Sequence, residues 1–257
     1  MKIGIIYCAY NTQEYLKDSL MPWMLARDSH LESNEFLICA VSVPFEKFNE
    51  PRLDDTAKNL THLYENKLID YVITDNNPIK ETEARTSALK YLVSKGADII
   101  WQVDSDEFYQ LEEISKIIKF VNSRPFVPSF YGSFKNYVFD LKTYLTEPFT
   151  PMRIHRVKTS TYTADLFWDD NNIMYVNVNN QQYLRDVHMT PLAIPKSVQF
   201  TKHLTWMSDA RGKKKVEYQI ARGWNCSFSW NYSKNCLEWN EDFFKKNGQN
   251  VPETSTD

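Results

Sequence analysis

The chain has 257 residues, of which 30 are Lys or Arg and 33 are Asp or Glu, so its formal net charge is -3. A hydrophobic content of 42% and a charged content of 25% are those of an ordinary globular protein, which excludes the fibrous and disordered classes. The 6 glycines form no GxGxxG or GxxxxGK[ST] phosphate loop, and the near-neutral charge argues against a dedicated nucleic-acid binder.

The N-terminal part of the chain alternates apolar runs with helical patterns. Strands are predicted for four runs, at 3–9, 36–43, 71–74 and 99–103. A first helix is predicted to begin within residues 11–14, and two more are predicted over 53–68 and 82–95. Gly96 follows the third helix and is the usual residue at a helix end. Since the run at 3–9 is continuously apolar and strands alternate with helices over about 105 residues, we expect a mostly parallel sheet buried on both faces, of α/β class.

After residue 125 the rhythm changes, because prolines divide the chain into short, aromatic-rich segments. Strands are predicted at 129–138, 152–157 and 173–178, and a last helix at 213–222. The chain shows no linker-like stretch and no internal repeat, so we expect one continuous domain over 1–257 with a mixed second half.

The cysteines and the apolar runs bear on the compartment. Cys8 and Cys39 lie in apolar runs, which indicates buried thiols, whereas Cys226 and Cys236 leave a disulfide as an open alternative. The longest apolar stretches have about eight residues, far below the length that spans a bilayer. With no recognisable signal peptide, we expect a cytoplasmic protein without an integral membrane segment; its oligomeric state stays open.

A cluster of acids follows the predicted strand at 99–103 directly. Asp104, Asp106 and Glu107 stand within four residues, with Ser105 between them, at a strand end where open α/β sheets bind their ligands. Their mutual repulsion is relieved by a divalent cation, and carboxylates suit Mn²⁺ or Mg²⁺. The alternative is a solvated acidic loop.

Four short segments carry a resemblance to a known family: EAR at 83–85, AL at 88–89, GADII at 96–100 and DSDE at 104–107. They resemble the core of family-2-type glycosyltransferases with the GT-A fold, in which a Gly-Ala-Asp turn leads into a strand that ends in a DxD motif. YNTQE at 10–14 is similar to the first strand-to-helix turn of that family, which holds the nucleotide. The similarity covers residues 3–108. Thr86 stands where the family usually has Asn, and the second strand lacks the usual acidic turn.

The resemblance implies a GT-A-like fold with a nucleotide-binding half at 1–108 and an acceptor-binding half at 109–257. It implies a metal-dependent glycosyltransferase that moves a sugar from a nucleotide-diphosphate donor to a saccharide or another hydroxyl-bearing acceptor, with inversion expected. The implied donor-binding residues are Ala9, Tyr10, Asn11, Arg85, Asp104 and Ser105. For Arg85, a contact to the donor and a plain helix-surface position are both open.

A second match lies in KHLTW at 202–206, followed by the lysine run 213–215. It resembles the HxxW…K segment of related enzymes, which implies His203 as a metal ligand beside Asp104 and Asp106, and Lys214 and Lys215 as diphosphate contacts. His188 is the competing histidine. The plain alternatives are a packed histidine and a solvated helix end.

An inverting transferase needs a carboxylate that takes the proton of the acceptor hydroxyl. Five carboxylates that follow the acidic cluster are candidates: Asp140, Glu147, Asp165, Asp169 and Asp170. Asp169 and Asp170 are preferred, because they follow Phe167 and Trp168 in an aromatic context that raises a carboxyl pKa. A turn before the next strand is the alternative for this pair. The aromatic side chains of 126–168 are read either as a sugar-stacking wall or as core.

Two other functions compete with the transferase. A nucleotidyltransferase acting on a sugar phosphate also uses acids and Mg²⁺ at α/β strand ends, but CAYNTQEYL at 8–16 lacks its Gly- and Arg/Lys-rich loop. A non-catalytic carbohydrate-binding module does not need the pair Asp104 and Asp106.

Overall fold

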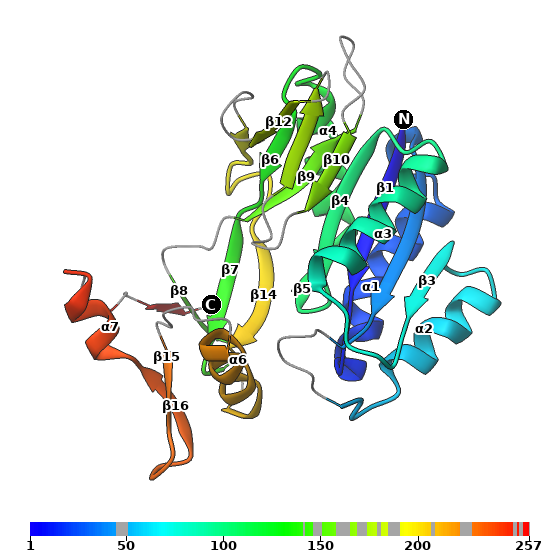
Figure 1. Cartoon of the computed structure of the whole chain (residues 1–257). Helices are drawn as coiled ribbons and strands as arrows, with labels where there is room; N and C mark the ends of the chain where they lie inside the picture. Colours follow the sequence, from blue (N-terminus) through cyan, green and yellow to red (C-terminus); the bar gives the residue numbers. More distant parts are fainter. Residues whose placement is uncertain are drawn as a thin grey trace. The chain divides into compact units, whose positions relative to one another are not determined.

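The computed structural model describes residues 1–44, 51–140, 142–145, 151–157, 165–168, 174–178, 181–184, 191–206, 209–221, 228–248, 251 and 254–256. The chain divides into two compact units. The first comprises Met1–Ser133 and Thr150–Gln199, and the second Phe134–Phe149 and Phe200–Asp257. The large sheet and its covering helices belong to the first unit (Figure 1).

The central sheet of the first unit has seven strands in the order β13-β6-β9-β4-β1-β2-β3. Four parallel strands form its core: β1 (Lys2–Cys8), β2 (Glu35–Ser42), β3 (Tyr71–Thr74) and β4 (Ile99–Asp104). The sheet continues through β9 (Met152–Arg156), antiparallel to both neighbours, to β6 (Ser129–Tyr131) and β13 (Leu192–Ala193). The mostly parallel α/β sheet is therefore confirmed.

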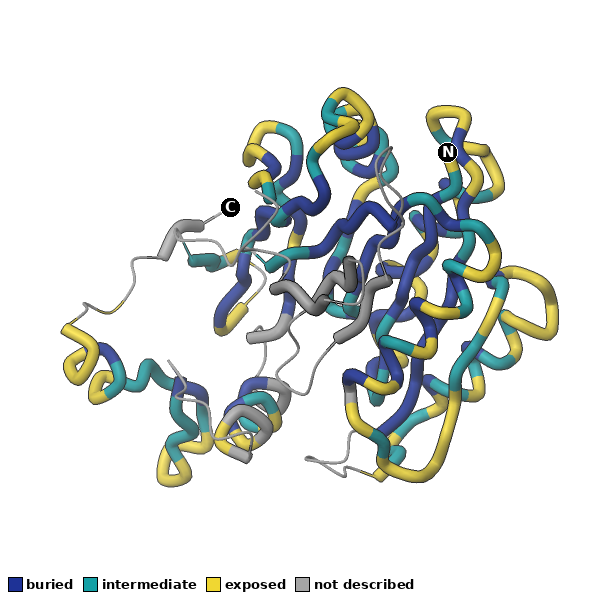
Figure 2. Tube along the Cα trace, turned by 45° about the horizontal axis from the view of Figure 1, so that its top comes forward, coloured by how far each residue is buried: buried dark blue, intermediate teal, exposed yellow. Residues whose placement is uncertain are grey.

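Helices cover both faces of this sheet (Figures 1 and 2). Successive side chains of a strand point to opposite faces, so the apolar strands present side chains to be buried on both. Ile6 and Ile100 pack against α3 (Glu81–Ser94), in a buried cluster with Ala88. On the other face, Trp101 meets Trp23 of α1 (Gln13–Asp28) with ring centroids 4.7 Å apart. The remaining elements between the strands are α2 (Thr56–Glu65), a 3-10 turn (Leu31–Ser33), β5 (Glu107–Phe108) and α4 (Leu111–Asn122).

Gly4 of β1 lets α3 approach the sheet closely. A Cβ placed on Gly4 would lie 3.1 Å from Leu92 Cβ and 3.0 Å from Ile100 Cδ1. Leu92 Cβ is fixed to the helix backbone, so any side chain at position 4 would push α3 away from the strand.

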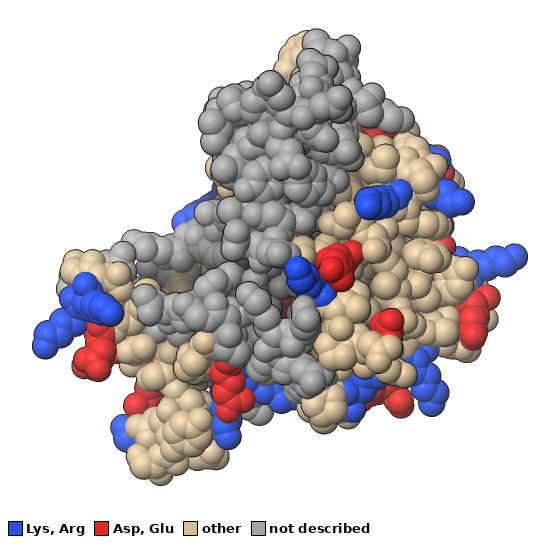
Figure 3. Space-filling view, viewed as in Figure 1, with Lys and Arg blue, Asp and Glu red and all other residues tan. Residues whose placement is uncertain are grey.

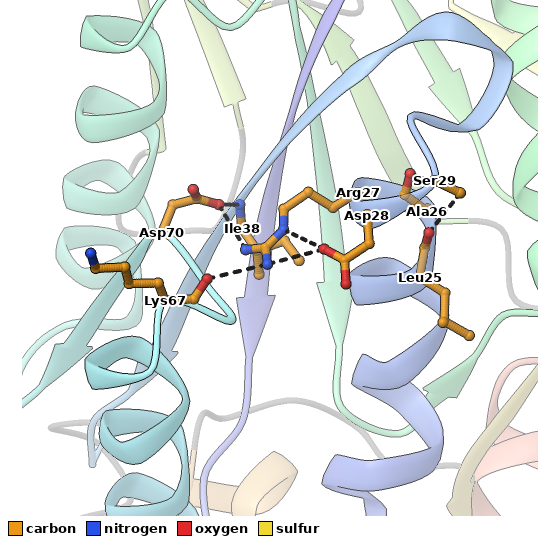
Figure 4. A network of polar contacts seen from close by, with 8 residues as sticks. All are labelled: Leu25, Ala26, Arg27, Asp28, Ser29, Ile38, Lys67 and Asp70. Atoms are coloured by element: carbon orange, nitrogen blue, oxygen red, sulfur yellow. Dashed lines mark hydrogen bonds and ion pairs between the residues drawn. The ribbon is translucent and has the colours of Figure 1, made fainter.

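A polar network ties α1 to the middle of β2 and to the residues just before β3 (Figure 4). Asp70 Oδ2 accepts a hydrogen bond from Ile38 N at 2.7 Å and lies 3.7 Å from Arg27 Nη1. Arg27 Nη2 also donates to the carbonyl of Lys67 and contacts Asp28. The network has a structural role, because it satisfies a backbone N–H next to the buried core.

Short strands complete both units. The first also holds an antiparallel sheet of β10 (Asp165–Trp168), β11 (Met174–Val178) and β12 (Gln181–Leu184). The second unit contains four neighbouring strands of one sheet. Their order in the sheet is β17 (Thr254–Thr256), β8 (Thr143–Leu145), β7 (Phe134–Val138) and β14 (Thr201–Trp206). They are joined by α6 (Asp209–Ala221), the hairpin β15 (Phe228–Asn231) and β16 (Cys236–Trp239), and α7 (Glu241–Lys246). Val138, Val216, Phe228 and Leu237 form the core of this unit.

The structure corrects three sequence predictions. The strand predicted at 129–138 is two strands, β6 and β7, which belong to different sheets. The helix predicted at 53–68 begins only at Thr56, and the one predicted at 213–222 begins at Asp209 and ends at Ala221. The amphipathic helix α4 was not predicted.

Cys39 is a buried thiol, as expected, whereas Cys8 is half-buried. Cys236 is a free cysteine and Cys226 lies outside the described residues. In the part of the chain that the structure describes, no helix combines the length and the apolar character that crossing a membrane requires.

Candidate active site

The carboxyl ends of β1 and β4 lie side by side, since Cys8 and Asp104 are register partners. Ser105 N donates to the Cys8 carbonyl at 2.9 Å, and Ala9 N donates to the Val41 carbonyl of β2 at 2.9 Å. The strand order β3-β2-β1-β4 reverses direction between β1 and β4. Such a reversal opens a crevice at the strand ends, where doubly wound sheets bind ligands. The structure thus brings together Ala9, Asp104 and Ser105, three of the residues that the sequence analysis assigned to the donor.

The turn after β1 is fixed by side-chain hydrogen bonds. Asn11 adopts a positive φ of 51°, a conformation that Asn tolerates better than most residues. Its Oδ1 accepts from Leu53 N and its Nδ2 donates to the Pro51 carbonyl, both at 2.9 Å. Asn11 therefore holds the segment that precedes α2 against the end of β1, and it acts here as a scaffold for the turn.

Arg52, which the sequence did not single out, joins three strand ends. Its Nη2 donates to the carbonyls of Ser42 at 2.9 Å and Asp75 at 2.6 Å, and its Nε donates to Asn76 Oδ1 at 2.9 Å. The guanidinium also lies 5.6 Å from the centroid of the Tyr10 ring. A planar cation and an aromatic ring thus stand together beside the ends of β1, β2 and β3.

The three acids after β4 occupy different environments. Glu107 is fully buried, and its carboxylate contacts Arg153 Nη2 and accepts from the Tyr109 hydroxyl at 3.3 Å. Burial raises the pKa of Glu107 to about 8, against the opposing influence of Arg153. Asp104 and Asp106 are half-buried. Glu107 is therefore interior, and only Asp104 and Asp106 can meet a ligand at the turn.

Asp104 is held by two arginines. Arg153 Nη2 of β9 donates to Asp104 Oδ2 at 2.6 Å, and Arg85 Nη2 of α3 lies 3.6 Å from Asp104 Oδ1. The Gln102 side-chain oxygen, in the amide orientation that these donors require, accepts from Arg153 Nη1 at 2.8 Å and from Arg85 Nη2 at 3.2 Å. Arg85 is buried, so its interpretation as a plain helix-surface residue is wrong.

Burial alone would lower the pKa of the Arg153 guanidinium, yet the carboxylates of Asp104 and Glu107 raise it above its usual value. Two permanent positive charges thus stand behind the acidic turn. They supply part of the charge compensation that the sequence analysis assigned to a metal ion alone.

The carboxylates of the turn suit Mg²⁺ or Mn²⁺ only if water or a bound ligand fills the other coordination positions of the ion. Within the described residues, no group of three or more His, Cys, Asp and Glu side chains could hold a metal ion. Asp104 and Asp106 offer hard oxygen ligands, and Mg²⁺ is commonly bound by one or two carboxylates with water and substrate phosphates filling the other positions. The turn fits a cation that arrives with a diphosphate, and not a closed protein cage.

The other predicted residues of the described chain lie in the second unit. His203 on β14 is buried, with its Nδ1 2.6 Å from Asn136 Oδ1 and its ring against Phe134. Lys214 on α6 is exposed and Lys215 is half-buried. The predicted bases Asp169 and Asp170, and the competing His188, lie outside the described residues.

Several of the aromatic side chains in the second half of the chain are buried in the protein core. Phe130, Phe134 and Tyr137 are fully buried, so these three cannot stack on a sugar. On the face drawn in Figure 3, the described Lys and Arg side chains are interspersed with Asp and Glu.

No protein-family model and no curated protein matches the chain. Among solved structures, S. aureus TarS matches with a TM-score of 0.50 at 14% identity, over 86% of this chain and 39% of TarS. The TarS fragment 1-349 matches with the same score and identity, over 65% of the fragment. The same fragment in complex with UDP-GlcNAc gives a TM-score of 0.48. The chain thus spans less than two thirds of these proteins, and at this identity the likeness concerns the fold.

Proposed function

We propose that the chain is a metal-dependent glycosyltransferase that moves a sugar from a nucleotide-diphosphate donor to an acceptor hydroxyl with inversion. The observation that carries the proposal is the acidic turn at the junction of β1 and β4. A half-buried carboxylate pair, Asp104 and Asp106, lies at the reversal point of the sheet, beside the turn that begins at Ala9. The fold shared with TarS supports a nucleotide-sugar donor, since a TarS fragment has been crystallised with UDP-GlcNAc.

The donor's nucleoside belongs beside the ends of β1 to β3 in this proposal. Ala9, Tyr10 and Asn11 provide backbone and ring contacts at the end of β1, and Arg52 adds a cation on the Tyr10 side. The diphosphate then reaches Ser105 and Arg85, where the guanidinium favours anionic oxygens.

Asp104 and Asp106 would hold Mn²⁺ or Mg²⁺ together with the diphosphate of the donor, which Lys214 and Lys215 would contact. His203 would join them as a third ligand only once the donor is bound, since the described residues hold no ready group of three such side chains. The bound cation would neutralise the charge that develops on the departing nucleoside diphosphate. The chain's own part is to hold the diphosphate in place and to take the proton of the acceptor hydroxyl. We assign that proton transfer to Asp169 or Asp170. The acceptor is a saccharide or another hydroxyl-bearing molecule.

The test is isothermal titration calorimetry with UDP, and separately GDP, in the presence and absence of Mn²⁺. We expect the wild-type protein to bind one of them with Mn²⁺ and Asp106→Asn to lose this binding. The unfolding temperature of Asp106→Asn should stay unchanged or rise slightly, because the substitution relieves repulsion in the turn. Full Mn²⁺-dependent binding by Asp106→Asn would overturn the metal site.

A hydrolysis assay then separates an enzyme from a binding module. The slow release of UDP from UDP-GlcNAc, or from another sugar nucleotide of a panel, is expected only from a transferase. Tight binding without any turnover of the donor by the wild-type protein would favour a non-catalytic module.

A further inference from the structure

Arg153 comes to the acidic turn from a strand that runs the opposite way to β4. The register pairs Trp101 with Ile154, so Arg153 stands next to Gln102 across the two strands. Alternation along β4 puts Gln102 and Asp104 on the same face, and the guanidinium reaches both. The antiparallel insertion of β9 thus places a buried cation against Asp104 and Glu107.

One nitrogen of Arg153 serves two carboxylates. Its Nη2 donates to Asp104 Oδ2 at 2.6 Å and also contacts the Glu107 carboxylate, while its Nη1 lies 2.8 Å from the Gln102 oxygen. The Arg153 side chain is 7% exposed and that of Asp104 is 27% exposed. Asp104 is therefore open to a ligand at the turn, whereas Arg153 is almost fully covered and would act on that ligand through Asp104.

We propose that Arg153 is a positioning residue, which fixes the Asp104 carboxylate in the orientation that receives the cation and diphosphate of the donor. The proposal rests on the proposed function. Its competitor is a purely structural role, in which Arg153 merely neutralises the buried Glu107. The two roles differ in their dependence on Glu107, because a structural Arg153 becomes dispensable once Glu107 carries no charge.

A charge-balanced double variant separates these roles. Arg153→Met alone leaves Glu107 buried beside Asp104 without its guanidinium, so its unfolding temperature should fall by roughly 10 °C. Arg153→Met combined with Glu107→Gln removes one positive and one negative charge and keeps an acceptor for the Tyr109 hydroxyl. The double variant should recover most of the unfolding temperature. Binding is therefore measured above about pH 8, where Glu107 is ionised in the wild type and the net charge around Asp104 is the same in both proteins, so any loss of binding reports orientation rather than charge.

Isothermal titration calorimetry with UDP or GDP and Mn²⁺ gives the decisive number. The double variant should bind about 10- to 100-fold more weakly than the wild type, the usual cost of losing a partner that orients a metal ligand. Arg156→Lys is the matched control. Arg156 lies on the same strand and is also buried, but it donates to the carbonyls of Val121 and Val127. Its replacement should lower the unfolding temperature and leave nucleotide affinity unchanged.

Wild-type affinity in the double variant would overturn the positioning role and leave the proposed function intact. A double variant that is as unstable as Arg153→Met would also overturn it, since Arg153 would then be required by the strand itself. If the wild-type protein binds neither nucleotide with Mn²⁺, the proposed function fails, and the positioning role fails with it.

Discussion

Glu107 gives the chain a specific pH dependence of stability. The residue is fully buried, and burial raises the pKa of its carboxyl from 4.5 to about 8. In the unfolded chain the carboxyl loses its proton near its ordinary pKa, whereas the folded chain keeps the proton up to about pH 8. Between these values the folded state binds more protons, so the free energy of unfolding falls as the pH rises.

The size of the effect follows from the two pKa values. Within the window the contribution of one carboxyl changes by about 1.4 kcal/mol per pH unit. From pH 5.5 to pH 7.5 the wild type should therefore lose roughly 3 kcal/mol relative to Glu107→Gln, whose amide does not titrate. Above about pH 8 both states of the wild type are ionised at this position, and the difference becomes constant.

Urea unfolding of the wild type and Glu107→Gln at half-unit steps from pH 5.5 to 8.5, in the presence of a chelator, measures this difference directly. Every other titrating group is shared and cancels. Glu112→Gln is the control. The hydrogen bond from Lys116 lowers the pKa of the exposed Glu112, so this carboxyl is ionised in both the folded and the unfolded chain over this pH range. Parallel curves for the wild type and Glu107→Gln would refute the argument, since they would mean that Arg153 keeps Glu107 ionised throughout.

Three further predictions concern packing, the polar network around Asp70 and the second unit. Gly4→Ala should lower the free energy of unfolding by about 1–3 kcal/mol in urea, because α3 must move; an unchanged midpoint would show that the helix yields freely. Asp70→Ala should cost about 1–3 kcal/mol, because a backbone N–H beside the core loses its acceptor, whereas Asp28→Ala, which removes an exposed partner, should stay within about 0.5 kcal/mol. Equal losses in these two variants would contradict that reasoning. His203→Ala should weaken Mn²⁺-dependent nucleotide binding about 10-fold by calorimetry, and unchanged affinity would remove His203 from the metal site.

The core of the fold could be predicted because its signals are local. The apolar run of β4 is buried at every position from Ile99 to Val103, and the residues at its end are the acids that mark the site. Element ends were predicted less well, because side chains decide them. The helix α2 starts at Thr56 rather than residue 53, since Asp54 accepts from Gln13 N and from Thr56 N in a turn before the helix.

The helix α4 was predictable although the sequence analysis did not predict it. Ile114, Ile117, Ile118 and Val121 recur at helical spacing and are all buried. A carboxylate three residues after the N-cap adds a start signal, because Gln110 and Glu113 form a capping box.

Arg153 and its contacts could not be read from the sequence. Arg153 stands 49 residues after Asp104, in a strand whose register with β4 depends on sheet pairing, and nothing in MRIHR at 152–156 distinguishes Arg153 from Arg156. The two differ by an odd number of positions along one strand, so they leave the sheet on opposite faces. One meets the acids, and the other meets the carbonyls at the end of α4. A shift of the register by one residue would turn both side chains to the opposite faces of the sheet.

This dependence on register limits what an acidic motif can say about its ligand. Three acids in four residues indicate a need for positive charge, and the sequence analysis assigned that need to a divalent cation. Two arginines from distant elements already face Asp104, and Glu107 is interior. What the turn still requires is smaller than the motif suggests, because Asp104 already faces two guanidinium groups. A single cation shared with a diphosphate meets that remaining need, whereas a fully protein-held metal would have to displace an arginine from Asp104. We therefore expect Mn²⁺ alone to bind weakly and Mn²⁺ with a nucleoside diphosphate to bind tightly, and equal affinity for Mn²⁺ in both titrations would contradict this reasoning.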